Sequence, residues 1–162
     1  AKNDGGKNMQ IELFVNGEKV HADVPPDMML LDFLRKMNLK SVKRGCDTGN
    51  CGLCTVWAEG KPVLSCSIPV HRMKGQHITT LEGVQEEAAE FSRFLAEEGS
   101  DQCGYCSPGL IMNVLALKKE IPHPTEQQMK EYLAGNLCRC TGYQGQYRAL
   151  MKYFDIEEGQ QA

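Results

Sequence analysis

The first part of the chain alternates apolar and polar residues in the manner of half-buried strands. Apolar side chains take the odd positions from Met9 to Val15, so a strand is expected there. Asn16 and Gly17 form the residue pair that most favours a tight hairpin turn. Alternation at residues 20–24 then predicts the returning strand of a hairpin.

The pattern becomes shorter and less regular after this hairpin. Asp27 can cap a helix, and the apolar run behind it predicts a short helix over residues 28–35. A glycine-rich segment that contains cysteines follows. Further short strands are expected, with glycine-containing turns between them, at residues 55–58, 63–67 and 77–81.

The second half of the sequence has helical periodicity instead. Apolar residues recur at helical intervals within residues 86–97, and Pro108 suits the first turn of a helix that continues to Leu117. Thr125 and Gln128 form a capping box at the start of the next helix. A last helix is expected over about residues 146–154. The sequence therefore predicts an α+β chain in which strands come first and helices second.

Length and charge exclude several functional classes. The 162 residues suffice for one ordinary domain or two small ones, and 41% hydrophobic with 24% charged residues is a globular composition. A net charge of −3 gives no basic excess, so a nucleic-acid partner is not expected. No apolar stretch is long enough to span a membrane, and residues 1–6 lack the apolar core of a secretory signal. A cytoplasmic protein is expected.

Eight cysteines change this picture most. Without an export signal they indicate metal or redox chemistry rather than a disulfide framework. The first set is Cys46-x4-Cys51-x2-Cys54, followed after eleven intervening residues by Cys66, which is the spacing of a plant-type [2Fe–2S] site. Glycines 45, 49 and 52 are expected to take positive φ and to bring backbone N–H groups to the sulfurs. Arg44 is expected to add a positive charge beside the cluster.

The second set is Cys103-x2-Cys106 with Cys138-x-Cys140. In an extended segment, residues i and i+2 point the same way, so Cys138 and Cys140 are expected to hold one iron together. Cys103 and Cys106 precede the helix of Pro108, whose positive N-terminal dipole would face an anionic cluster.

Other chemistries of cysteine explain the pattern less completely. A thiol–disulfide motif would leave four cysteines idle, and structural zinc would favour paired C-x2-C spacings. A Rieske centre needs two histidine ligands, and covalent haem needs a histidine directly after C-x2-C. Two alternatives remain open at this stage, a free-standing ferredoxin-like electron carrier and a zinc-stabilised binding module.

Residues 45–56, 102–109 and 135–143 together resemble the small iron–sulfur subunit of the molybdenum hydroxylases. This is the family of xanthine dehydrogenase, aldehyde oxidoreductase, nicotinate dehydrogenase and carbon monoxide dehydrogenase. The resemblance covers roughly residues 9–154. It implies a plant-type ferredoxin-like (β-grasp) domain over residues 9–81 and an all-α four-helix domain over residues 82–155.

The resemblance also implies the cofactors, the partners and the role of the chain. The ferredoxin-like domain would hold one [2Fe–2S] cluster on Cys46, Cys51, Cys54 and Cys66, and the helical domain a second on Cys103, Cys106, Cys138 and Cys140. Gln102 and Cys140 would lie near the pterin. The chain itself would have no catalytic residue. It would pass single electrons from a molybdopterin-binding large subunit to an FAD-binding medium subunit, and a purine or other N-heterocycle is the expected substrate of the complex.

Overall fold

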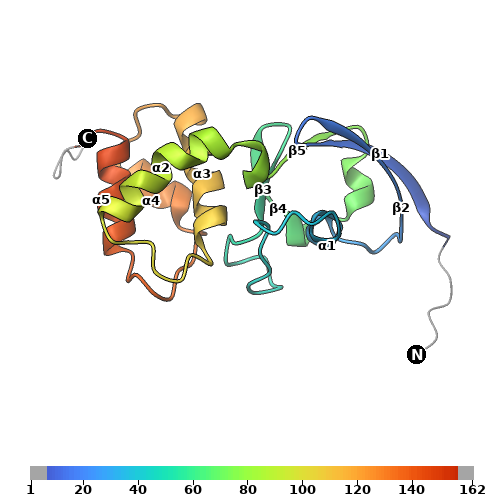
Figure 1. Cartoon of the computed structure of the whole chain (residues 1–162), viewed down its shortest axis with the longest axis horizontal. Helices are drawn as coiled ribbons and strands as arrows, with labels where there is room; N and C mark the ends of the chain where they lie inside the picture. The colour runs from blue at the N-terminus through green and yellow to red at the C-terminus, as the bar shows by residue number, and fades with distance from the viewer. Residues whose placement is uncertain (1–6, 157–162) are drawn as a thin grey trace.

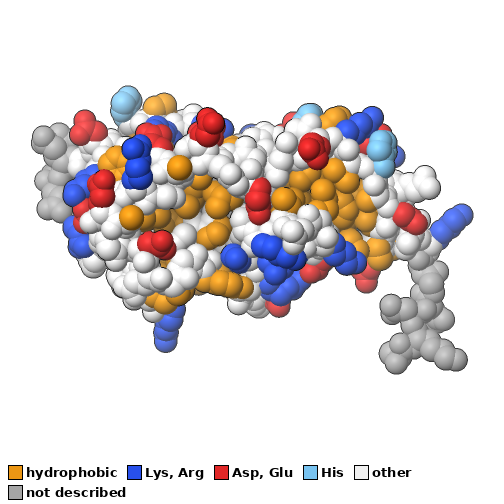
Figure 2. Space-filling model, viewed as in Figure 1, with side chains coloured by type: hydrophobic (Ala, Val, Ile, Leu, Met, Phe, Trp, Pro, Cys, Tyr) orange, Lys and Arg blue, Asp and Glu red, His pale blue; other side chains and the backbone are white. Residues whose placement is uncertain are grey.

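The computed structural model describes residues 7–156. Residues 1–6, in which no secretory signal is expected, lie outside the described range. Figure 1 shows a strand-rich half on the right and a helical half on the left, joined side by side. Acidic and basic side chains are interspersed over the face in Figure 2. No helix in the described part of the chain is both long and apolar enough to cross a membrane. The α+β prediction is confirmed.

The strand-rich half is a single mixed sheet of two hairpins with one strand between them. Its strands are β1 (Met9–Val15), β2 (Glu18–Val24), β3 (Thr55–Ala58), β4 (Lys61–Leu64) and β5 (His77–Thr79). The order across the sheet is β2-β1-β5-β3-β4. β5 runs parallel to β1 and antiparallel to β3, so the last strand of the sheet joins the two hairpins. The first four cysteines lie on the segment that leads into β3 and on the segment that follows β4. Both segments are at the same end of these two strands.

Helix α1 (Leu30–Lys36) begins two residues later than the sequence predicts, and Asp27 does not cap it. Residues 28–30 pair instead with the chain around Pro69: the Leu30 N–H donates to the Ile68 carbonyl over 2.8 Å. Such a long-range pairing leaves no trace in local periodicity. Leu30, Leu31 and Leu34 then place the buried face of α1 against the sheet.

The predicted strand over residues 63–67 is also partly wrong. The strand ends at Leu64, and a 3-10 turn, η1 (Ser65–Ser67), follows. The buried Ser65 hydroxyl donates to the Cys54 carbonyl over 2.7 Å, which ties this turn to the cysteine loop. The turn therefore brings Cys66 back towards Cys54.

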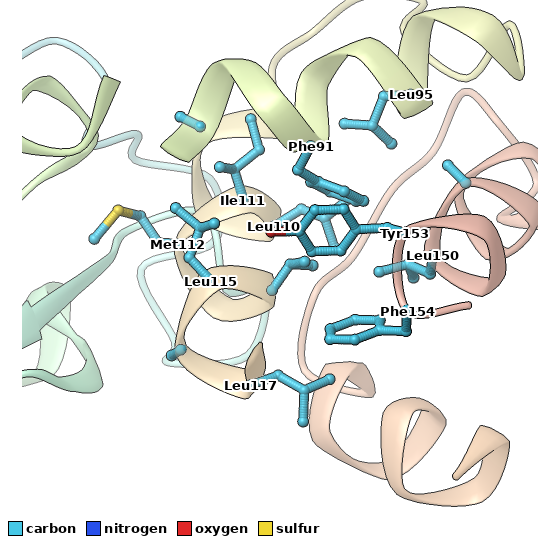
Figure 3. Packing of buried hydrophobic residues seen from close by; sticks show 14 of the residues in the cluster. Phe91, Leu95, Leu110, Ile111, Met112, Leu115, Leu117, Leu150, Tyr153 and Phe154 are labelled. Carbon is cyan, nitrogen blue, oxygen red and sulfur yellow. The ribbon is translucent and has the colours of Figure 1, made fainter. Parts of the chain in front are cut away.

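The helical half consists of α2 (Gln85–Glu97), α3 (Ser107–Glu120), α4 (Glu126–Leu133) and α5 (Gln144–Tyr153). Helix α3 lies at its centre and is buried almost all round, with Phe91 of α2 and Tyr153 of α5 against it (Figure 3). Thr125 and Gln128 make both hydrogen bonds of the predicted capping box. Pro108 sits in the first turn of α3 as expected.

Close backbone packing joins the two halves. A Cβ atom on Gly109 of α3 would lie 3.0 Å from the Cα atom of Leu53, and it would also press on the Gly52 carbonyl. Gly52 has φ +72°, and a Cβ atom added to it would lie 3.2 Å from the Cα atom of Asn136. Trp57 of β3 lies in the core of the helical half, and its indole N–H donates to the Met112 carbonyl over 2.9 Å. These contacts fix the two cysteine sets relative to each other.

Glu82 fastens the connection between the halves. Its carboxylate accepts hydrogen bonds from the Ser41 N–H (3.0 Å) and the Thr80 hydroxyl (2.6 Å), and the Thr80 N–H donates to Asn16 (2.9 Å). Burial alone would raise the pKa of Glu82, but the hydrogen bonds from Ser41 and Thr80 outweigh it and hold the pKa below its usual value. The charged form is therefore the one that the fold prefers.

Glu82→Gln is expected to lower the free energy of unfolding by about 1–2 kcal/mol at pH 7, because it removes a charged acceptor from this network. The folded-state pKa is depressed, so the contribution of Glu82 is present above its unfolded-state pKa and is lost as the pH falls through the folded value. The difference from the unmodified protein, measured by urea unfolding, should shrink between pH 7 and pH 3.5. Glu18→Gln, at an exposed position, is the control, and equal trends in the two variants would contradict the assignment.

Candidate metal centres

The first cysteine set lies on the loop between α1 and β3 and on the η1 turn. Its thiols form two contacting pairs, Cys46 with Cys51 and Cys54 with Cys66. The pair formed by Cys54 and Cys66 lies deeper than the other pair, because Cys54 is buried in the core beneath the sheet. All four residues lie at one end of the sheet, on the segments that lead into β3 and follow β4.

Backbone N–H groups point at the outer pair. The Cys46 sulfur accepts from the N–H groups of Thr48 (3.5 Å) and Asn50 (3.4 Å), which lower the pKa of the Cys46 thiol to about 6. Burial has the opposite effect on Cys54 and raises its pKa to about 11. The loop therefore offers one thiolate that is ready at neutral pH and one thiol that stays protonated until a metal replaces the proton.

Two details of the predicted loop are wrong. Gly49 and Gly52 have positive φ, but Gly45 does not. Gly45 is needed there for lack of space, because a Cβ atom at this position would lie 3.0 Å from the Cys51 sulfur. Arg44 does not act as a free positive charge, because Asp32 and Asp47 both pair with its guanidinium. Arg44 fastens α1 to the loop instead.

The second cysteine set joins the turn before α3 to the loop between α4 and α5. The Cys103 and Cys140 sulfurs lie 3.4 Å apart, and the thiol of Cys106 contacts that of Cys138. The expectation that Cys138 and Cys140 form one pair is wrong. The chain turns directly after Cys138, whose sulfur accepts from the Cys140 N–H over 3.4 Å, so the two side chains do not project together as they would from a strand.

The pKa values in the second set also diverge. Burial would raise the pKa of Cys138, but the Thr141 hydroxyl, 3.3 Å from the sulfur, and nearby N–H groups lower it to about 7. Burial, together with the neighbouring Cys138 sulfur, raises the pKa of Cys106 to about 11. The second set therefore repeats the combination of one ready thiolate and one protonated thiol.

A cavity of about 500 Å³ lies between the two sets. Its lining includes Cys51 from the first set and all four cysteines of the second. The Leu137 N–H donates to the Cys51 carbonyl over 3.0 Å, so the two cysteine loops touch through their backbones. Gln102 is exposed beside Cys103, which is exposed as well.

Comparison with known proteins assigns each half. A 2Fe-2S iron-sulfur cluster binding domain matches residues 13–74, and a [2Fe-2S] binding domain matches residues 80–151. The chain is 42% identical over 146 residues to a probable xanthine dehydrogenase subunit of Bacillus subtilis (strain 168), an alignment that covers 88% of this chain and 84% of the relative. The chain belongs to the iron–sulfur subunits of the molybdenum hydroxylases.

Longer proteins and a solved structure show the same similarity. Aldehyde oxidase 2 of Rattus norvegicus is 42% identical over 149 residues, which are 83% of this chain and 11% of that protein. The crystal structure of quinoline 2-oxidoreductase from Pseudomonas putida 86 superposes with a TM-score of 0.82 at 33% identity and covers 90% of this chain and 91% of its own. As a molybdenum hydroxylase iron–sulfur subunit, the chain carries two [2Fe–2S] clusters and transfers electrons.

The donor atoms fit such clusters better than a single ion. A [2Fe–2S] cluster needs two thiolates on each of two irons, and each set presents its thiols as two pairs. A structural zinc would draw four thiolates to one point. Both families that match the chain are [2Fe–2S] binding domains, so the zinc-stabilised binding module is not favoured.

Sequence reasoning missed several residues that support the iron–sulfur subunit's second set. The Tyr143 hydroxyl accepts from the Cys138 N–H over 2.9 Å, and Thr141 donates to the Cys138 sulfur. Tyr143 itself has φ +68°, a conformation rare for a residue with a large side chain. Their position in the sequence, directly after the last cysteines, could have indicated this role, because hydrogen bonds to ligand residues commonly come from the same loop.

Proposed function

We propose that the chain relays single electrons between a molybdopterin-binding large subunit and an FAD-binding medium subunit through clusters on its eight cysteines. The first [2Fe–2S] cluster would be held by Cys46, Cys51, Cys54 and Cys66, and the second by Cys103, Cys106, Cys138 and Cys140. The observation that carries this assignment is the arrangement of each set as two contacting thiol pairs.

The bound clusters would each accept and release one electron at a time. The chain's own part is to hold them close together and to surround them with donors. The Leu137–Cys51 backbone hydrogen bond and the close approach of Gly109 to Gly52 fix the separation of the two loops. The N–H groups of Thr48 and Asn50 place partial positive charge beside the first cluster's sulfurs.

The large subunit would cover the side of the second set. Cys103 and Cys140 are exposed there, and Tyr105, Leu137 and Tyr143 are between 44% and 46% exposed, which is unusual for large hydrophobic side chains. Figure 2 shows further hydrophobic side chains at the surface of both halves. In this arrangement Gln102 and Cys140 would approach the pterin, and the medium subunit would meet the half-buried Cys46 and Cys66.

We place the domain boundary between residues 81 and 82, so that the domains are 9–81 and 82–155. Two separate hydrophobic cores support this division, with Trp57 as the residue that the helical core takes from the first domain. The eight cysteines assigned as iron ligands have to stay reduced, which a compartment such as the cytoplasm favours.

A purine or other N-heterocycle is the substrate class we propose for the complex. The names of the xanthine dehydrogenase relative and of quinoline 2-oxidoreductase support it, while that of aldehyde oxidase supports an aldehyde. The substrate would contact the large subunit, so the class would be decided by residues outside this chain.

The test is EPR of the anaerobically purified, dithionite-reduced complex, with spins counted per copy of this chain. We expect two distinct S = 1/2 signals that add up to about two spins. A colourless protein from iron-sufficient cells, without either signal, would contradict the assignment and favour zinc. Two signals from a chain that never co-purifies with larger subunits would favour the free-standing ferredoxin-like carrier.

A further inference from the structure

Gln146 is one of the few buried polar residues of the helical half. It lies in the first turn of α5 and is 7% exposed. Its side-chain nitrogen lies 3.6 Å from the Cys106 sulfur, which is within hydrogen-bonding distance for a sulfur acceptor. A buried amide group costs free energy unless it is hydrogen-bonded, and this sulfur is the partner that the described residues give its nitrogen.

The origin of this donor distinguishes it from the others in the second set. The Cys140 N–H and the Thr141 hydroxyl, which reach the Cys138 sulfur, belong to the same loop as Cys138. Gln146 reaches Cys106 from a helix, across a separation of 40 residues. Whether Cys106 receives this hydrogen bond therefore depends on the side chain at position 146 and not on the path of the backbone.

The first turn of α5 is held firmly in place. A Cβ atom on Gly145 would lie 2.8 Å from the Cβ atom of Ser100, so the helix starts directly against the end of α2. The Arg148 guanidinium pairs with Glu98 on the same segment at 2.7 Å. These contacts on either side of Gln146 fix the position from which its amide points at the sulfur.

We propose that Gln146 raises the reduction potential of the second cluster by donating a hydrogen bond to the Cys106 thiolate. Reduction adds negative charge to the cluster, and a donor at a ligand sulfur stabilises the more negative state more strongly. Gln146 thereby favours the arrival of an electron at the second cluster. This inference rests on the proposed assignment of Cys106 as a ligand.

The orientation of the Gln146 amide separates the proposed role from a structural one. Its nitrogen, which carries the N–H donors, is the atom that lies 3.6 Å from the Cys106 sulfur. A purely structural glutamine would fill the space equally well with its amide turned away from the sulfur.

The test is a redox titration followed by EPR on the complex that contains Gln146→Met. Methionine has a similar volume and no N–H donor. We expect both signals to remain, with the midpoint potential of the second cluster lowered by about 59 mV, an about tenfold smaller equilibrium constant for reduction. The first cluster serves as an internal control. Gln144→Met changes an exposed residue of the same turn and should shift neither potential.

The possible outcomes separate this inference from the function itself. An unchanged potential for the second cluster in Gln146→Met, with both signals present, would overturn the inference and leave the ligand assignment intact. If Gln146→Met lost the second cluster, Gln146→Leu, which is also uncharged and has no N–H donor, would decide: a lowered potential supports the inference, and renewed loss shows a structural role instead. Absence of the second signal from the unmodified complex would contradict the proposed function.

Discussion

Cys51→Ser is expected to abolish the EPR signal of the first cluster and to leave that of the second. Cys51 is 8% exposed and contacts Cys46, so its loss removes one thiolate from one of the two pairs. A serine hydroxyl stays protonated far above neutral pH, so it is a much poorer iron ligand than a thiolate. Roughly half of the iron per chain should disappear. Iron analysis and spin counting of the reduced protein measure this effect.

The two sets should respond independently, although their loops touch. The hydrogen bond from Leu137 reaches the backbone carbonyl of residue 51, which serine retains. Cys106→Ser is the matched variant and should give the reciprocal result. Loss of both signals in either variant would contradict the assignment of one cluster to each domain.

Gly109→Ala is expected to lower the free energy of unfolding by about 1–3 kcal/mol, although alanine favours a helix over glycine by about 1 kcal/mol. The new Cβ atom would meet the backbone of Gly52 and Leu53, at 3.0 Å from the Leu53 Cα atom. Backbone atoms cannot move aside as a flexible side chain can. The two halves would have to separate slightly, and both cysteine loops would move with them.

Denaturant unfolding of Gly109→Ala in the cluster-loaded protein measures the effect. Gly135→Ala is the control, because nothing lies within 4 Å of its Cβ position and its φ is not in the left-handed region. It should change the free energy of unfolding by less than about 0.5 kcal/mol. Equal stability of the two variants would show that the junction is looser than the structure indicates.

The parts of the fold that local sequence determines could be predicted. Proline at the start of α3 and the capping box of α4 are short-range signals, and both helices lie where these signals place them. The position of β5 between β1 and β3 was not predictable, because strand order depends on contacts between distant segments. The late start of α1 has the same cause, since Met29 pairs with Pro69.

The candidate site divides in a similar way. Spacing predicts that Cys51 and Cys54 lie on one loop, because covalent chain length limits how far neighbouring ligands can separate. The contact of Cys103 with Cys140 joins segments 37 residues apart, so it depends on the tertiary fold. The pairing of Cys138 was wrong, since the rule for residues i and i+2 holds only in an extended segment and this segment turns. Gln146 was missed because nothing in an isolated sequence shows that a helix beginning 38 residues after Cys106 aims a side chain back at it.

The burial of Trp57 also gives the molecule a built-in optical probe. It is the only tryptophan in the sequence, it is 3% exposed, and it belongs to a strand of one half while lying in the core of the other. Its indole donates to the Met112 carbonyl, and the Lys119 ammonium lies 4.0 Å from the centre of its ring. Both contacts cross the junction. The emission of this single fluorophore therefore reports whether the halves are docked, even where each half remains folded.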